Sequence, residues 1–425
     1  MSDSGYSVYR YRWVVLAVFM LANMAIQILW IAYAPITGPA ASFYGVTDLQ
    51  IGLLAMVFMI VFIPMSIPVA WMIDTYGFRL AVGIGVVLMA VFGVLRGLAG
   101  ASYPLVLAST IGIAMGQPFM MNSWTKLPAN WFPVRERATA VGFAVLSTLG
   151  GIALGMGLTP VLAEKVSIPT LQLIYGGVAV ASALLFIGLA RERPPTPPCP
   201  PGHESRALML DGLKHALRVK TFWLYLLVWF VGNGVFNGVS TWIESIIRPR
   251  GFTPAQAGQA GAIMIIGGIL GALIVPALSD RQQKRQRYIL LGTLLCVPGL
   301  LGLAFATSYL LLVCSVFVLG FFLICPGPIG MQYAAEITHP TPEGTSAGLI
   351  QLFGQASVVF VYLMDAIKSP SGSFTPPLLV SIVLTLVAAL AVTQLKDSLA
   401  VRGRVTPALS PSAIEDVDAA EVGDG

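Results

Sequence analysis

Residues 13–36 read WVVLAVFMLANMAIQILWIAYAPI, and this stretch contains no Asp, Glu, Lys or Arg. Hydrocarbon offers backbone amides no partner, so an apolar stretch of about twenty residues is expected to cross a bilayer as a helix. Runs of the same kind recur as far as Gln394, and the charged residues gather in the gaps between them. The pattern therefore predicts an all-α membrane protein.

The composition agrees with this prediction. Hydrophobic residues make up 56% of the chain and charged residues 10%, against roughly 25% charged in a soluble domain. The net charge of +5 does not indicate nucleic-acid binding, because the basic residues are dispersed over short loops. The four cysteines have no metal-ligand spacing and the three histidines fall in predicted loops. We therefore expect no metal, no cofactor and no enzyme activity.

The apolar runs predict twelve spanning helices. Their expected ranges are 13–36, 50–73, 79–99, 103–126, 137–163, 170–190, 221–247, 255–279, 288–306, 309–335, 346–367 and 375–395. A Pro-rich segment separates the sixth from the seventh. The predicted organisation is a six-helix bundle over 1–190, a cytoplasmic linker over 191–220, a second six-helix bundle over 221–396 and a disordered cytoplasmic tail over 397–425.

The placement of Lys and Arg predicts the orientation, because positively charged loops resist translocation. With a cytoplasmic N-terminus, 19 of the 24 Lys and Arg residues fall on the cytoplasmic side. Both termini are then cytoplasmic, and the expected location is the cytoplasmic (inner) membrane. The first apolar run is too long for a cleaved signal and lacks a small-residue cleavage site, so it is expected to remain as a helix.

The loops after the second helix of each half are alike. One reads Asp74-Thr-Tyr-Gly-Phe-Arg79 and the other Asp280-Arg281-Gln-Gln-Lys-Arg285. A carboxylate at a helix end followed by cations can lock a helix pair while the cytoplasmic side is closed. The alternative is an ordinary loop with scattered charges. Twelve helices in a 6+6 division with these duplicated loops resemble the major facilitator superfamily, whose fold consists of two pseudo-symmetric six-helix bundles.

Several stretches resemble one branch of that superfamily, the transporters related to the feline leukaemia virus subgroup C receptor (FLVCR). They are Gln27-Ile-Leu-Trp-Ile-Ala-Tyr33, Gly116-Gln-Pro-Phe119, Trp131-Phe-Pro133, Glu136-Arg-Ala-Thr-Ala140, Phe321-Phe-Leu323, Pro328-Ile-Gly-Met-Gln-Tyr-Ala-Ala-Glu-Ile-Thr-His-Pro340, Glu343-Gly-Thr-Ser-Ala-Gly-Leu349 and Gln355. The resemblance implies a transporter that alternates access around a central cavity. It also implies a choline-like cation or haem as substrate, since relatives have been linked to both.

The same resemblance implies three positions around the ligand. In choline-handling members these are a tryptophan of helix 1, a tyrosine of helix 7 and a glutamine of helix 11. Trp30 and Gln355 match, whereas Asn237 stands at the tyrosine position. One wall of the aromatic cage is therefore missing, and a quaternary ammonium is held mainly by aromatic faces.

Four further residues are candidates for substrate binding. Tyr33 shares a helix face with Trp30, although such a pair is also common in packing or in an interfacial belt. Trp242 lies in a helix expected to line the cavity, and Asn122 lies one turn before Lys126. Gln332 is expected to face the cavity from the tenth helix.

Two acids are candidates for proton coupling. A carboxylate in a low dielectric holds its proton more tightly, and an approaching cation loosens it, which can link proton and substrate movement. Glu244 stands near the outer end of the seventh helix, with a pair to Arg248 as the alternative. Asp365 stands near the outer end of the eleventh helix, where a surface pair with Lys368 is favoured over a proton role.

The expected cytoplasmic gate combines the two repeated loops with two helix ends. Its members are Asp74, Arg79, Lys126, Asp280, Arg281 and Glu336. For Lys126, snorkelling at a helix end is an equally good explanation. The predicted function is secondary-active transport of a small organic solute, with protons as a candidate second partner and a monomer as the expected state. The alternatives are a facilitative uniporter, a non-transporting receptor or sensor, and a polytopic enzyme.

Overall fold

A computed structural model describes residues 7–198, 210–282, 284–338, 341 and 343–395. The tail predicted over 397–425 lies outside these residues. The middle of the predicted linker (199–209, with Cys199 and His203) and His339 also lie outside them.

Within the described ranges, twelve helical segments are long and apolar enough to span a membrane. The first half contains α1 (Arg12–Ile31), η1 (Ala34–Ile36), α2 (Thr37–Tyr44), α3 (Asp48–Tyr76), α4 (Phe78–Leu98), α5 (Tyr103–Met121), α6 (Lys126–Trp131), α7 (Val134–Ala163) and α8 (Ile168–Leu189). The second half contains α9 (Leu210–Arg218), α10 (Lys220–Ile247), η2 (Arg248–Arg250), α11 (Pro254–Gln282), α12 (Arg285–Phe305), α13 (Tyr309–Ile324), α14 (Pro326–Ile337), α15 (Glu343–Ala356), α16 (Val358–Ala366) and α17 (Thr375–Thr393). The prediction of an all-α fold with twelve spanning helices in two six-helix bundles is confirmed.

Three spans are interrupted rather than continuous. The first extends past the expected end at residue 36 to Tyr44, because Pro35 lies in the first turn of η1, where a helix tolerates the missing N–H of proline. In the tenth span, Pro326 starts α14 directly after Cys325. Ser357 separates α15 from α16 in the eleventh. Such breaks leave backbone carbonyls near the middle of the bundle that side chains can use.

Within each half, small residues allow the helices to approach closely. Gly93 of α4 and Gly176 of α8 face each other, and a Cβ added at Gly176 would lie 2.8 Å from the Gly93 carbonyl oxygen. A Cβ added at Gly97 would lie 2.7 Å from the Leu173 nitrogen on the same pair of helices. Lipid gives no hydrophobic drive for helices to associate, so close van der Waals packing of this kind holds the bundle together.

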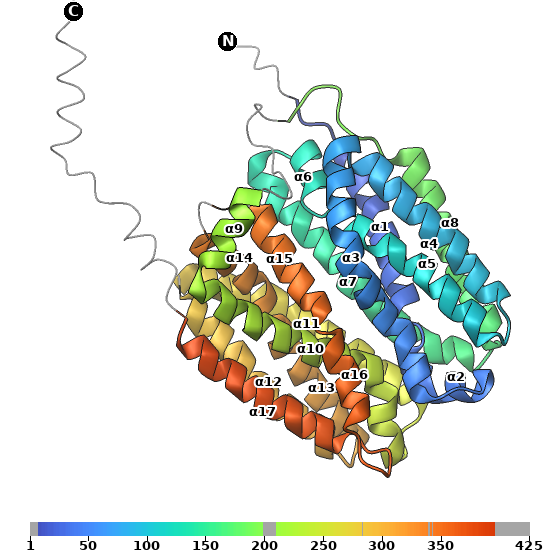
Figure 1. Ribbon diagram of the computed structural model, residues 1–425. Helices are drawn as coiled ribbons and strands as arrows, with labels where there is room; N and C mark the ends of the chain where they lie inside the picture. The colour runs from blue at the N-terminus through green and yellow to red at the C-terminus, as the bar shows by residue number, and fades with distance from the viewer. Residues whose placement is uncertain (1–6, 199–209, 283, 339–340, 342, 396–425) are drawn as a thin grey trace, which may run out of the picture.

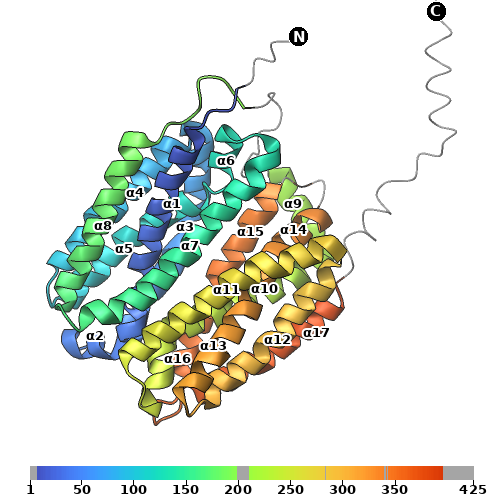
Figure 2. The ribbon, with the colours of Figure 1, turned by 180° about the vertical axis from the view of Figure 1, so that it is seen from behind.

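The two halves meet along three sets of elements. The α7 helix packs on α11, α3 packs on α15 and α16, and η1 with α2 packs on α10. Figure 1 and the reverse view in Figure 2 show α2 and α16 toward one end of the molecule, and α6, α9 and α14 toward the end where the chain termini emerge. We call the end with α2 the outer end and the end with α6 and α9 the inner end.

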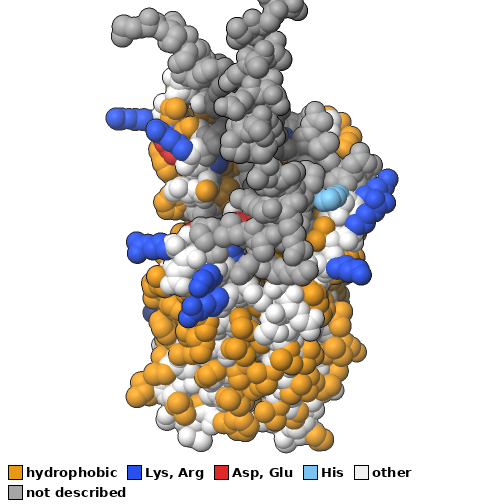
Figure 3. All heavy atoms as spheres, turned by 90° about the vertical axis from the view of Figure 1, so that its left-hand side faces the viewer, with side chains coloured by type: hydrophobic (Ala, Val, Ile, Leu, Met, Phe, Trp, Pro, Cys, Tyr) orange, Lys and Arg blue, Asp and Glu red, His pale blue; other side chains and the backbone are white. Residues whose placement is uncertain are grey.

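The surface around the sides of the two bundles is apolar. Leu184, Leu310 and Leu390 are 66%, 73% and 65% exposed, and each belongs to a spanning helix. On the face seen in Figure 3, hydrophobic side chains cover the lower part, and Lys and Arg gather above them. An apolar surface of this extent indicates contact with lipid. The chain is therefore an integral, multi-pass membrane protein.

Candidate functional site

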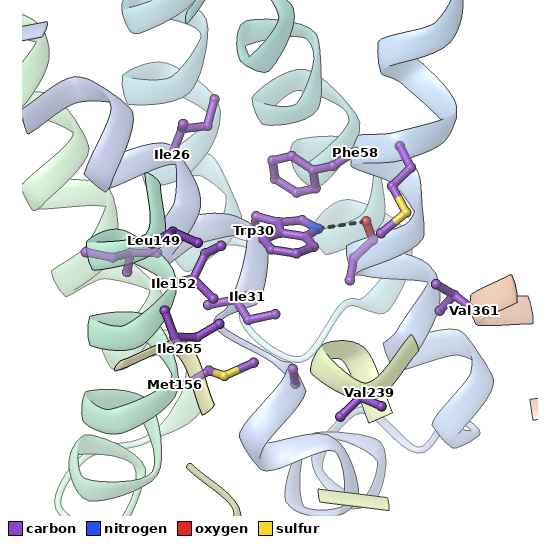
Figure 4. Close-up of a cluster of buried hydrophobic side chains, with 14 of the residues drawn as sticks. Ile26, Trp30, Ile31, Phe58, Leu149, Ile152, Met156, Val239, Ile265 and Val361 are labelled. Carbon is purple, nitrogen blue, oxygen red and sulfur yellow. Dashed lines mark hydrogen bonds between the residues drawn. The ribbon is translucent and has the colours of Figure 1, made fainter. Parts of the chain in front are cut away.

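Trp30 lies near the end of α1, where the helix gives way to η1. Its side chain is only 6% exposed, and the indole Nε1 donates a hydrogen bond of 3.2 Å to the carbonyl oxygen of Ala55 on α3. Figure 4 shows the ring between Ile31 and Phe58, with the dashed bond to the neighbouring helix. The bond fixes the orientation of the ring, so a flat aromatic face is held in place between α1 and α3.

In the second half, Asn237 and Gln355 come from α10 and α15. Asn237 is buried, and its Nδ2 donates to Ser357 Oγ at 3.2 Å. Ser357 in turn donates to the Gly354 carbonyl oxygen at 2.6 Å, at the break between α15 and α16. Gln355 is half-buried, and its side chain makes no hydrogen bond to the residues that the structure describes. Its amide is thus available to a solute.

Two further polar side chains, on α10 and α5, were not assigned from sequence. The Nε1 of Trp229 on α10 is buried without a partner, and a Cβ added at Gly354 would lie 2.9 Å from it. The Oε1 of Gln117 on α5 is also buried without a partner. A sequence signal existed for both. Trp229 precedes Asn237 by about two turns and shares its helix face, and Gln117 is a lone amide in an apolar run.

Trp242 is fully buried. Its Nε1 donates to the Val361 carbonyl oxygen of α16 at 2.9 Å, and its ring centroid lies 5.7 Å from that of Phe374, with the two rings tilted. A Cβ added at Gly52 of α3 would overlap this ring. The indole therefore fills the contact between α3 and α10, and the substrate-binding assignment made from sequence stays a prediction.

Tyr33 points into the first bundle instead of toward the second half. Its hydroxyl lies 3.1 Å from that of Tyr44, and the Arg96 guanidinium lies 5.4 Å from its ring centroid. Arg96 of α4 is only 1% exposed. Its Nη1 donates to the Leu29 carbonyl oxygen at 2.9 Å. This buried cation therefore positions the backbone next to Trp30.

A charged network joins the two halves at the outer end. Glu244 of α10 is 2% exposed and accepts a hydrogen bond of 3.1 Å from the backbone N–H of Gly38 in α2. It also pairs with Arg248 at 3.4 Å, and Arg248 pairs with Asp48 at the start of α3. We call Gly38, Asp48, Glu244 and Arg248 the outer network. The pair with Arg248 was the alternative considered from sequence, and the proton-coupling role of Glu244 stays a prediction.

The second candidate acid, Asp365, lies at the end of α16. It is 8% exposed and accepts a hydrogen bond of 2.6 Å from Lys368 Nζ. This is the i,i+3 pair that the sequence analysis favoured.

The inner end of the first half carries one of the two predicted groups of gate residues. Asp74 at the end of α3 pairs with Lys126 of α6 at 3.0 Å. Arg79 has an exposed side chain, and its backbone N–H donates to Glu192 Oε2 at 2.7 Å. Asn122, predicted to bind substrate, donates to the Ser66 carbonyl oxygen at 3.0 Å. The contacts of Asp74 and Asn122 tie α3 to the region between α5 and α6.

The inner end of the second half carries the other group. Arg285 pairs with Asp280 at 2.6 Å and with Glu336 at 3.2 Å. Gln332 donates to the same Glu336 Oε1 at 3.2 Å, and Arg281 is exposed. The structure thus places Gln332 beside Glu336. The Glu336 carboxylate lies near the negative end of the α14 dipole, which is unfavourable, and the Arg285 guanidinium offsets this repulsion.

The described residues contain no group of His, Cys, Asp or Glu that could hold a metal ion. Besides the charged outer network, the candidates Trp30, Asn237 and Gln355 supply an aromatic face and two amides.

Comparison with known proteins gives the class. The family model of the Major Facilitator Superfamily matches residues 15–362. The chain belongs to this superfamily of membrane transporters. Within it, the chain belongs to the FLVCR-related branch.

Three relatives show the extent of the similarity. Solute carrier family 49 member A3 of Danio rerio is 31% identical, over 87% of this chain and 81% of that protein. The choline/ethanolamine transporter FLVCR2 of Homo sapiens is 28% identical, over 90% of this chain and 76% of that protein. The choline/ethanolamine transporter FLVCR1 of Felis catus is 29% identical, over 81% of this chain and 66% of that protein. The resemblance read from sequence motifs is confirmed at the level of the branch.

Proposed function

We propose that this protein is a secondary transporter that moves a small organic cation by alternating access. The observation that carries the proposal is the outer network, in which Glu244 and Arg248 of one half contact Gly38 and Asp48 of the other. The named ion pairs at the inner end, Lys126 with Asp74 and Arg285 with Glu336, each stay within one half. Pairs that cross between halves must break when the outer side opens, whereas pairs within a half can persist.

The proposed binding site lies between Trp30 on one half and Gln355 with Asn237 on the other. An aromatic face attracts a cation, and an amide oxygen can accept a hydrogen bond from an ammonium or hydroxyl group. Two relatives are named as choline/ethanolamine transporters. Asn237 favours a cation with N–H or O–H donors over a fully methylated ammonium, because an amide replaces an aromatic wall here.

Proton coupling is the second part of the proposal, and Glu244 carries it. The acid is buried and linked to both halves, so its charge affects whether the outer end closes. Protonation removes the charge that Arg248 meets, weakens the outer network and favours opening toward the outside. Proton movement and solute movement would then be linked through one equilibrium.

The remaining parts concern placement and assembly. We propose that the protein acts as a monomer in the cytoplasmic membrane with both chain ends on the cytoplasmic side, that it binds no nucleic acid and that it has no catalytic activity. The Lys and Arg bias supports the orientation.

The test is counterflow in proteoliposomes with labelled ethanolamine and labelled choline. A transporter exchanges internal for external solute, and ethanolamine is expected to exchange faster than choline. Binding without exchange would indicate a sensor, and chemical change of the solute would indicate an enzyme. A uniporter would exchange solute but would not accumulate it when a pH gradient is imposed.

A further inference from the structure

A groove of about 230 Å³ opens at the inner end of the second half, away from the proposed transport site. It lies between the start of α12 and the end of α17. Its lining residues are Lys284, Gln286, Arg287, Leu290 and Thr393. A water molecule takes up about 30 Å³ of liquid, so the groove has room for a phosphate group.

The groove carries positive charge. Lys284 and Arg287 are both exposed, and neither belongs to an ion pair between described residues. Arg281, exposed at the end of α11, adds a third cation nearby. Two carboxylates of this region, Asp280 and Glu336, both pair with Arg285, which is only 7% exposed. An anion entering the groove therefore meets cations that have no carboxylate partner in the described part of the chain.

The backbone on the two sides of the groove also favours an anion. The first N–H groups of α12, a helix of 21 residues, have no partner within the helix and attract negative charge. The last carbonyl groups of α17 carry partial negative charge and would repel an anion. Gln286 occupies two of them, because its Nε2 donates to the carbonyl oxygens of Val392 and Thr393 at 3.0 Å each.

The groove continues into the surface that faces lipid. Leu290 forms part of its wall, and Leu291 and Leu294, further along α12, are each 39% exposed. On the other side, Leu390 of α17 is 65% exposed. Figure 3 shows cations on this side of the molecule directly above the apolar surface. A ligand with an anionic head and apolar chains matches both parts.

We propose that this groove binds the phosphate headgroup of an anionic phospholipid from the inner leaflet, with the acyl chains along α12 and α17. Basic pockets between spanning helices on the cytoplasmic side recognise such headgroups. Lys284 and Arg287 supply the charge, the start of α12 supplies N–H donors, and the exposed leucines meet the chains. The site is separate from Trp30 and Gln355, so its occupancy adjusts stability without contributing to solute recognition.

The test compares thermal stabilisation of the purified full chain by phosphatidylglycerol and by phosphatidylcholine in detergent. Lys284→Gln with Arg287→Gln is expected to weaken the phosphatidylglycerol effect, measured as the half-maximal lipid concentration, by about thirtyfold. The matched control is Arg193→Gln with Lys214→Gln, which removes the same charge from exposed positions outside the groove. The charge-conserving pair Lys284→Arg with Arg287→Lys should retain binding.

Two outcomes would overturn the proposal. Equal weakening in the groove variant and the control would show that the lipid responds to net charge alone. Equal stabilisation by inorganic phosphate or glycerol phosphate, without acyl chains, would show that the ligand is a free anion. Retained binding in the charge-conserving variant guards against loss of signal through misfolding.

Discussion

At the scale of single residues, recognition depends on Trp30 and Gln355. Trp30→Ala and Gln355→Ala are expected to weaken binding of an organic cation by roughly tenfold each, because each removes one wall of the site. The measurement is ligand-induced thermal stabilisation. Trp30→Phe should retain part of the affinity, since a ring remains. Trp13→Ala, at a position 43% exposed on the surface of α1, is the control. Unchanged affinity in both alanine variants would remove these residues from the site.

Glu244 gives a second prediction at this scale. Glu244→Gln keeps the shape of the side chain and can still accept a hydrogen bond from the Gly38 N–H, but the amide cannot gain or lose a charge. The variant should retain solute exchange and lose accumulation driven by an imposed pH gradient. Asp365→Asn, which removes the acid paired with Lys368, should retain both activities. If Glu244→Gln still accumulates solute when protons drive it, the coupling acid lies elsewhere.

The residue scale is also where sequence reasoning was least complete. Resemblance assigned Trp30 and Gln355, but nothing assigned the unpartnered Nε1 of Trp229 or the buried guanidinium of Arg96. The direction of a side chain depends on the rotation of its helix, and a span that is apolar on all sides carries little information about that rotation. Arg96 stands in the last turn of α4, where a charged side chain would ordinarily snorkel to water, but its guanidinium is buried.

At the scale of elements, the sequence was more informative. The length of a spanning helix is set by the bilayer, so apolar runs alone predicted the twelve spans. The end of the first span was predicted too early, because Pro35 lies in the first turn of η1 and the span continues through α2. The link between α2, α3 and α10 required coordinates, because Asp48 and Arg248 are far apart in sequence.

That link gives the prediction for elements. Asp48→Asn removes the carboxylate that pairs with Arg248 across the halves. The Asp48 side chain is 22% exposed and the Arg248 side chain 41%. Partly exposed pairs contribute up to about 1 kcal/mol, so the open population should rise by at most about fivefold. A cysteine at Thr37, which is 1% exposed, reports outer opening by its labelling rate once the native cysteines are replaced. Asp48→Glu should label like the parent. Equal labelling of Asp48→Asn and the parent would show that the pair does not hold the outer end closed.

At the scale of the whole molecule, the two bundles constitute one two-state system if access alternates. Changes at opposite ends must then act on the same equilibrium. Asp48 contacts Arg248 across the halves in the outer network. Asp74 pairs with Lys126 within its own half in this structure, so its predicted role in the inner gate applies to the state in which the inner end is closed. A carboxylate that locks the inner end while it is closed favours the outward-facing state, and one that ties the outer end favours the inward-facing state.

The last prediction follows from this opposition. Asp74→Asn should increase the inward-open population, and Asp48→Asn should increase the outward-open population. The double variant should have populations between those of the two single variants, because the two effects on a single equilibrium partly cancel. Spin labels at Arg135 and Arg218 report the inner distance, and labels at Phe43 and Leu310 report the outer distance; all four positions are exposed. The inner distance should lengthen in Asp74→Asn while the outer distance does not. If both distances lengthen together in one variant, the bundles separate without alternating, and Asp74 is an ordinary loop anchor.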